Sequence, residues 1–178
     1  MTSPRNKSPI SLPSQARLNE LLEYRPSTGY LTWKVQLGSR ALVGQRAGCV
    51  KTERGKPGHR AVRIDRVLYQ EHRIIWVLVY GKEPVCEIDH INGNAMDNRL
   101  CNLREATGSE NRSNIGLIKS NTSGLKGVGW HKAKNKWRAY IGKDGRYIHL
   151  GLFEKKSDAA AAYAQAAKKY FGEYARIN

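Results

Sequence analysis

The chain has 178 residues, with 31 Lys and Arg against 15 Asp and Glu, and therefore a formal charge of +16. This charge is far from that of an ordinary metabolic enzyme and indicates a polyanionic partner, although a basic ribosomal or membrane-surface protein would share it. No apolar run of about 18 residues occurs, so we expect no transmembrane helix and no membrane partner. The opening stretch MTSPRNKSPISLPSQ also lacks the apolar core of a secretory signal.

The first third of the chain predicts a helix and a strand behind a polar start. Residues 1–13 are rich in Ser, Pro and Lys and are expected to be disordered. Leucines at helical spacing predict a helix over 14–24. Turn residues at 25–29 then lead into a strand over 30–35. We interpret this segment as supporting structure.

A basic, glycine-rich segment over 38–60 follows, which is expected to form a loop or weak hairpin. Such a segment is either a solvated surface or a loop that follows a phosphate backbone, and the sequence favours neither. Beyond it, short apolar runs predict a hairpin over 61–69 that turns at Asp65-Arg66, and a helix over 70–80 ended by Gly81.

Three cysteines, Cys49, Cys86 and Cys101, are scattered along the chain without a C-x-x-C pair. This pattern excludes a four-cysteine structural zinc, so we expect none. Unpaired thiols suit a reducing cytosol, which predicts a cytoplasmic protein of a bacterial or phage-infected cell. Cys86 and Cys101 flank the motif on its two expected strands, where we expect them to be small buried residues, although they could also face each other across the hairpin.

The most informative stretch is EIDHINGNAMDNRLCNLREATGSENRSN, over 87–114. It predicts a strand over 85–88, a turn, a second strand over 102–106, and a helix that begins after Thr107 in a capping box. A strand-strand-helix unit of this kind would place polar side chains from all three elements close together.

The residue types in this stretch suit hydrolysis of a phosphodiester. Histidine, with an unperturbed pKa of about 6.5, is suited to deprotonate water, which makes His90 the candidate base. Asp89 and Asn111 offer oxygen ligands of the kind that a hard divalent ion prefers. The alternative is that Asp89 and His90 form an ordinary hydrogen-bonding pair at the surface.

The segment IDHINGNAMDNRLCNLREAT resembles the HNH endonuclease motif, in the phage-borne and homing-type variant whose last histidine is replaced by asparagine. The opening LNELLEYRPSTGYLTWK also resembles the lead-in of phage HNH proteins. The resemblance implies a ββα-metal fold with His90 as general base, and Asp89 and Asn111 as ligands of a divalent ion, Mg²⁺ with Mn²⁺ as the alternative. It also implies that Asn102 braces the loop and orients the histidine. In that subgroup a His-Arg pair like His72-Arg73 lies near the active site, so this pair either contacts phosphate or makes a structural hydrogen bond.

The C-terminal third changes character after a small, polar linker over 119–124. Alternating runs predict three strands, over 126–131, 136–141 and 146–150, with one apolar and one basic face. An alanine-rich helix, capped by Ser157-Asp158 and running to Phe171, would cover the apolar face. The expected fold class is thus α+β: a nuclease domain over 14–118, and a three-stranded antiparallel sheet packed on one helix over 125–178.

The other face of this sheet suits the major groove of DNA. The runs GVGWHKAKNKWRAYI and GRYIHLGLF, followed by DAAAAYAQAAKKYFGEYARIN, resemble the DNA-binding domain of plant ethylene-response (Apetala-type) transcription factors. The resemblance implies that the sheet binds double-stranded DNA, but not the plant target sequence, because Tyr147 and His149 replace residues used there. The candidate DNA-contacting residues of this face are Lys132, Lys134, Lys136, Arg138, Tyr140, Arg146, Tyr147 and His149.

The two halves together predict a metal-dependent DNA endonuclease, homing-type or phage-encoded, with a sheet module that targets double-stranded DNA. One alternative is a DNA-binding regulatory protein with an inactive nuclease domain. Another is an RNA-binding or ribosome-associated basic protein. The oligomeric state stays open, with nicking natural for a monomer and double-strand cleavage natural for a dimer.

Overall fold

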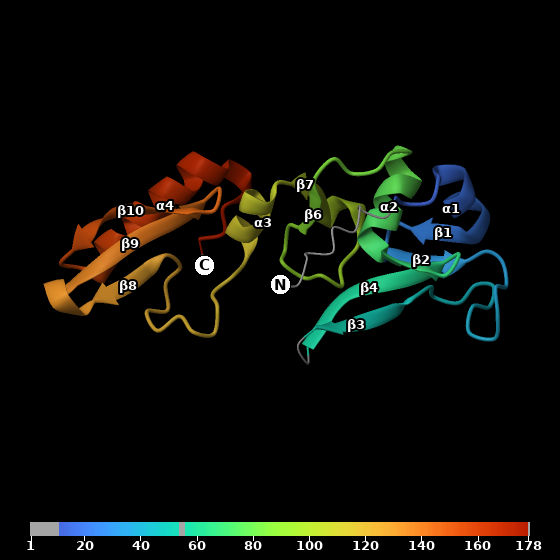
Figure 1. Cartoon of the computed structure of the whole chain (residues 1–178), viewed down its shortest axis with the longest axis horizontal. Coiled ribbons are helices and arrows are strands. Elements are labelled where there is room, and N and C mark those ends of the chain that lie inside the picture. Colours follow the sequence, from blue (N-terminus) through green and yellow to red (C-terminus); the bar gives the residue numbers. More distant parts are fainter. Residues whose placement is uncertain (1–10, 54–55, 178) are drawn as a thin grey trace, which may run out of the picture. The chain divides into compact units, whose positions relative to one another are not determined.

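The computed structural model describes residues 11–53 and 56–177 (Figure 1). The chain forms two compact units. The first contains Met1–Val85 and Asn94–Leu103, and the second contains Cys86–Gly93 and Arg104–Asn178. The expected disorder falls largely on residues 1–10, outside the described part. Ser11 and Leu12, which are described, both donate hydrogen bonds of 2.8 Å to Glu83.

The first unit opens with α1 (Gln15–Leu21) and the hairpin of β1 (Leu22–Arg25) and β2 (Tyr30–Trp33). The Ser14 hydroxyl caps α1 by accepting a hydrogen bond from a backbone N–H of the first turn. The helix is shorter than predicted because Leu22 adopts extended dihedral angles and begins a strand. Its leucine stripe is nevertheless buried, as the spacing predicts.

The same unit continues with a three-stranded sheet and a helix, which supply its remaining core. The elements are β3 (Cys49–Glu53), β4 (Lys56–Ile64), β5 (Val67–Gln70) and α2 (Glu71–Tyr80), with the strands in the order β3-β4-β5. Asp65 and Arg66 form the predicted two-residue turn, with φ of 47° and 69°. Gly81 ends α2 with φ of 71°. The segment over 38–60, expected as a loop or weak hairpin, contains β3 and the first half of β4.

Glu71 is the polar centre of this unit, although the apolar pattern of α2 gave no sign of it. Its side chain is fully buried. It accepts a hydrogen bond of 2.8 Å from the amide of Asn98, and the guanidinium groups of Arg60 and Arg46 lie 3.5 and 4.0 Å from it. Burial raises the pKa of this carboxyl, while the two arginines oppose the increase. The contact with Asn98 ties the segment 94–103 to α2.

The strand-strand-helix unit predicted around the polar motif is present. It consists of β6 (Glu87–His90), which pairs with β7 (Leu103–Ala106), and of α3 (Gly108–Asn114). Thr107 and Glu110 form the predicted capping box at the start of α3. β6 starts two residues later than predicted, and a 3₁₀ turn over Leu100–Asn102 delays β7 by one residue.

The C-terminal part is an antiparallel sheet with a helix packed on one face (Figure 1). Its elements are β8 (Val128–His131), β9 (Lys136–Lys143), β10 (Arg146–Phe153) and α4 (Lys156–Phe171), with β9 in the centre. The alternation is as predicted, because Ala139 and Ile141 are buried against α4 while Arg138 is exposed. A bulge after His149 and the longer β9 and β10 were not predicted. The helix begins at Lys156, before the predicted cap.

The cysteines correct one expectation. Cys86 and Cys101 are exposed, as is Cys49, so these two are not the small buried residues that the sequence favoured. Among the described residues, none of the helices has both the length and the apolar character needed to cross a membrane.

Candidate active site

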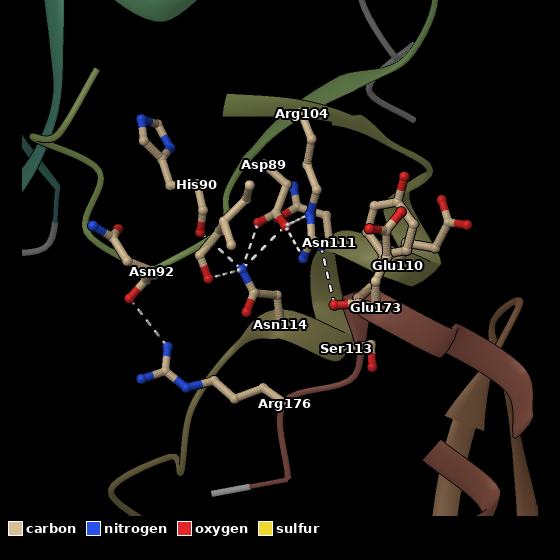
Figure 2. A network of polar contacts seen from close by, with 12 residues as sticks. Asp89, His90, Asn92, Arg104, Glu110, Asn111, Ser113, Asn114, Glu173 and Arg176 are labelled. Atoms are coloured by element: carbon tan, nitrogen blue, oxygen red, sulfur yellow. Dashed lines mark hydrogen bonds and ion pairs between the residues drawn. The ribbon is translucent and has the colours of Figure 1, made fainter. Parts of the chain in front are cut away.

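The end of β6 presents the two central residues of the motif. Asp89 and His90 are 4% and 6% exposed. Successive side chains of a strand point to opposite faces, and the imidazole of His90 points away from the polar network around Asp89 (Figure 2). The structure therefore brings Asp89, rather than the side chain of the candidate base, into this network.

Asp89 is held by two side chains that the sequence analysis did not select. Arg104 of β7 contacts Oδ2 of Asp89 with both Nε and Nη2 at 2.9 Å. Nδ2 of Asn114, in the last turn of α3, lies 2.9 and 3.0 Å from Oδ1 and Oδ2. A buried carboxylate needs such partners because burial without them costs several kcal/mol. Its position is thus fixed from two elements at once.

Asn114 also binds the backbone at the end of β6. Its Nδ2 lies 2.8 Å from the carbonyl oxygen of His90 and 3.3 Å from that of Ile91. One amide group therefore fixes the carboxylate and the turn that follows it (Figure 2). Asn114 is three residues after Asn111, on the same face of the helix, and this spacing was the only sign of its role in the sequence.

Among the described residues, no hydrogen bond joins the side chain of Asn111 to Asp89. Its Nδ2 donates to Oε2 of Glu87 at 2.5 Å. This bond fixes the amide and leaves its oxygen as the group available to a cation. In Asp89, Arg104 engages only Oδ2, while Oδ1 accepts a single hydrogen bond, from Asn114, and keeps a further lone pair for a cation. One carboxylate oxygen and one amide oxygen, each on a side chain fixed by neighbours, fit the hard oxygen donors of Mg²⁺.

Asn102 lies in the first unit and is 6% exposed. Its Nδ2 donates to the carbonyl oxygen of Asp97 at 2.8 Å, so the side chain braces the loop before β7, in line with the expectation for that position. The orientation of the histidine by Asn102 stays a prediction.

His72 and Arg73 begin α2, also in the first unit. His72 is 3% exposed, and its ring centroid lies 5.0 Å from that of His59. So little exposed surface favours the structural alternative for His72 over a phosphate contact. Arg73 is half-buried.

Four of the candidate DNA-contacting residues, Arg138, Tyr140, Tyr147 and His149, lie on the sheet face opposite α4. Arg146 instead pairs with Lys143 and shares its side of the sheet with Ile148, which packs in the cluster under α4. Arg138, Arg146 and His149 are exposed, and Tyr147 is 80% exposed. The rings of Tyr140 and Tyr147 lie edge to face at 5.7 Å, next to the guanidinium of Arg138. Lys132 and Lys134 are exposed in the 3₁₀ turn between β8 and β9, while Lys136 is half-buried and pairs with Glu154 at 2.9 Å. This face therefore offers cations and aromatic rings together.

Comparisons with known proteins cover the motif and much of the chain. A family model described as HNH endonuclease matches residues 69–113. Protein 3.8 of Escherichia phage T7 is 34% identical over 109 residues, which are 61% of this chain and 89% of the phage protein. An uncharacterized HNH endonuclease of Acanthamoeba polyphaga mimivirus is 35% identical over 126 residues, 70% of this chain but only 64% of the viral protein. No solved structure gives a significant match.

Proposed function

Because the chain belongs to the HNH endonucleases, we propose that it hydrolyses DNA with a divalent metal ion held by Asp89 and Asn111, and with His90 as general base. Support comes from the buried Asp89, which lies inside the region matched to the family and is fixed by Arg104 and Asn114. A carboxylate of a family motif that is held this firmly is the observation that carries the proposal.

Each of these residues has a separate role in the proposed reaction. The imidazole of His90 takes a proton from the water that attacks phosphorus, a task for which histidine is suited as a general base. A bound divalent ion would neutralise charge on the phosphate and on the departing oxygen. Arg104 and Asn114 keep Oδ2 of Asp89 occupied, and Glu87 keeps the amide of Asn111 in place. Asn102 keeps the loop before β7 in one conformation.

We further propose that the C-terminal sheet is an Apetala-type module that binds double-stranded DNA and brings it to the nuclease. The family match ends at residue 113, so this assignment depends on the sheet itself. From Lys119 onward the chain has 13 Lys and Arg against 4 Asp and Glu, a difference of +9. Phosphates are bound by such cations, and an exposed sheet face can enter the major groove.

The test is a cleavage assay on supercoiled plasmid and phage DNA with Mg²⁺ or Mn²⁺. The wild type should give open circles or linear product, and EDTA should stop the reaction without changing the circular dichroism spectrum. His90→Ala should abolish cleavage and leave DNA affinity within a few fold, because the base acts only in the chemical step. Asp89→Asn should also abolish cleavage. Asp97→Asn is its matched control, because Asp97 pairs with Arg99 at 2.7 Å in the same motif but is not a proposed ligand.

The outcomes separate the alternatives. A wild type that shifts duplex DNA but never cuts it, with any of these substrates and metals, would favour the regulatory protein with an inactive nuclease domain. Binding that RNA displaces better than duplex DNA would favour the RNA-binding alternative. A collapse of the circular dichroism signal in EDTA would show a structural metal that the sequence did not predict.

A further inference from the structure

The chain that follows α4 returns to the strand-strand-helix unit. The 3₁₀ turn Gly172–Tyr174 brings the tyrosine to β7, where its hydroxyl donates a hydrogen bond of 3.0 Å to the carbonyl oxygen of Glu105. The backbone N–H of Arg176 donates to the carbonyl oxygen of Ser113 in α3, at 3.3 Å. We call residues 172–176 the return segment. All of these contacts lie within the second compact unit.

The return segment contacts the side chain that holds Asp89. Nη1 of Arg104 donates to the carbonyl oxygen of Glu173 at 3.0 Å, and its guanidinium lies 4.1 Å from the ring centroid of Tyr174. Nε and Nη2 of the same group are engaged by Asp89. The Arg104 side chain, 14% exposed, is thus fixed along two edges and on one face (Figure 2).

We propose that the return segment belongs to the nuclease site, where Tyr174 and the Glu173 carbonyl act as positioning groups for Arg104 and, through it, for Asp89. A free arginine side chain has many rotamers, and ordering it opposes any contact that it makes. The segment supplies this order in advance, so that Arg104 stays on Oδ2 of Asp89 and the carboxylate keeps one orientation, in which Oδ1 contacts Asn114 and would also bind the cation. The inference rests on the proposed function, since it gives Asp89 the role of metal ligand.

One consequence is that the nuclease site depends on the C-terminal sheet. Tyr174 packs against the same core cluster as Ile148 and Leu150 of β10 and Tyr170 of α4. Its ring therefore connects the interior of the proposed DNA-binding module with Arg104. A chain that lacks this module loses a part of the nuclease site as well as DNA affinity.

The chain offers a matched pair of tyrosines for a test. Both Tyr170 and Tyr174 are half-buried against the same cluster, and each ring lies near a cation, Lys143 at 4.9 Å and Arg104 at 4.1 Å. Only Tyr174 reaches the side chain that holds Asp89. Tyr174→Leu and Tyr170→Leu should therefore lose similar packing and differ in their effect on the site.

The experiment measures Mn²⁺ binding to the full-length, DNA-free protein by calorimetry, together with kcat and KM for DNA cleavage. Loss of a partner that fixes a metal ligand costs about 10- to 100-fold in metal affinity or activity. We expect Tyr174→Leu to weaken Mn²⁺ binding and lower kcat by at least about tenfold, with KM for DNA unchanged. Tyr174→Phe, which keeps the ring over Arg104, should stay close to the wild type. Arg104→Lys, which loses the planar fork, should reproduce the defect.

Equal Mn²⁺ affinity and kcat in Tyr174→Leu and Tyr170→Leu would overturn the proposal and leave the return segment as packing alone. If Tyr174→Leu does not fold, the Arg104→Lys variant decides. Mn²⁺ affinity and kcat equal to those of the wild type in that variant would overturn the proposal. Mn²⁺ binding also separates this inference from the proposed function. A wild type that binds Mn²⁺ but does not cut refutes the nuclease function, and weaker binding in Tyr174→Leu then still supports the return segment. A wild type without Mn²⁺ binding refutes both.

Discussion

Among single residues, Asn114 has the largest set of polar contacts around the candidate site. Its Nδ2 serves both oxygens of Asp89 and two backbone carbonyls, and the side chain is 6% exposed. Asn114→Ala leaves buried acceptors without this donor, which should lower the free energy of unfolding by about 1–3 kcal/mol. Urea denaturation measures the change.

Asn111→Ala is the matched control on the same helix face. It loses one hydrogen bond, to the exposed side chain of Glu87, and should cost less than about 1 kcal/mol. Its cleavage activity should nevertheless be lost, since we propose its oxygen as a metal ligand. If Asn111→Ala is as destabilising as Asn114→Ala, the two asparagines do not divide structure and function in this way.

At the same scale, the sequence predicts some site residues and misses others for a physical reason. Asp89 and His90 are recognisable because their order and spacing follow the family motif. Arg104 and Glu71 are not, because their roles come from partners distant in the chain, the Glu173 carbonyl in one case and Arg60 and Asn98 in the other. Local residue patterns do not specify which buried charges will meet.

At the scale of elements, α3 depends on its capping box. It is only seven residues long, which makes its formation sensitive to the first turn. The Thr107 hydroxyl accepts a hydrogen bond from the N–H of Glu110. The Glu110 carboxylate accepts one from the N–H of Thr107, at 2.7 Å, and one from the Thr107 hydroxyl, at 2.8 Å, and these two bonds lower the pKa of Glu110. Thr107→Ala should cost about 1 kcal/mol in urea denaturation. The exposed Thr122→Ala serves as control, and an equal loss in both variants would contradict the role of the cap.

Sequence patterns predict the elements better than their ends. The alternating runs give all three C-terminal strands, and the capping box gives the start of α3. The predicted end of α1 was wrong, because Leu22 fits the leucine spacing of the helix and is equally suited to a strand. The β3–β4 hairpin was predicted only as a loop or weak hairpin, because a basic, glycine-rich segment carries little apolar alternation.

At the scale of the whole molecule, the folded state holds one lysine out of water, which opposes its protonation. Lys126 contacts the carbonyl oxygen of Ser113, and burial, with a smaller effect of Arg176, lowers its pKa to about 8. The folded state therefore binds fewer protons than the unfolded state between pH 8 and the ordinary lysine pKa of 10.5. As the pH rises through this window, the free energy of unfolding of the wild type should increase relative to that of Lys126→Met. Urea denaturation at several pH values tests the sign, with the exposed Lys119→Met as control.

The distribution of charge over the molecule sets how DNA binding responds to salt. Each phosphate neutralised by a cation contributes about 0.9 to the slope of log affinity against log salt concentration. Arg138 is exposed on the sheet face opposite α4, so Arg138→Gln should lower this slope by about one unit, measured in EDTA to prevent cleavage. Lys168→Gln removes the same charge from an exposed position of α4 and should leave the slope unchanged. Tyr147→Ala should weaken binding without changing the slope, because its ring carries no charge. Equal slopes for Arg138→Gln and Lys168→Gln would mean that net charge, rather than this face of the sheet, holds the DNA.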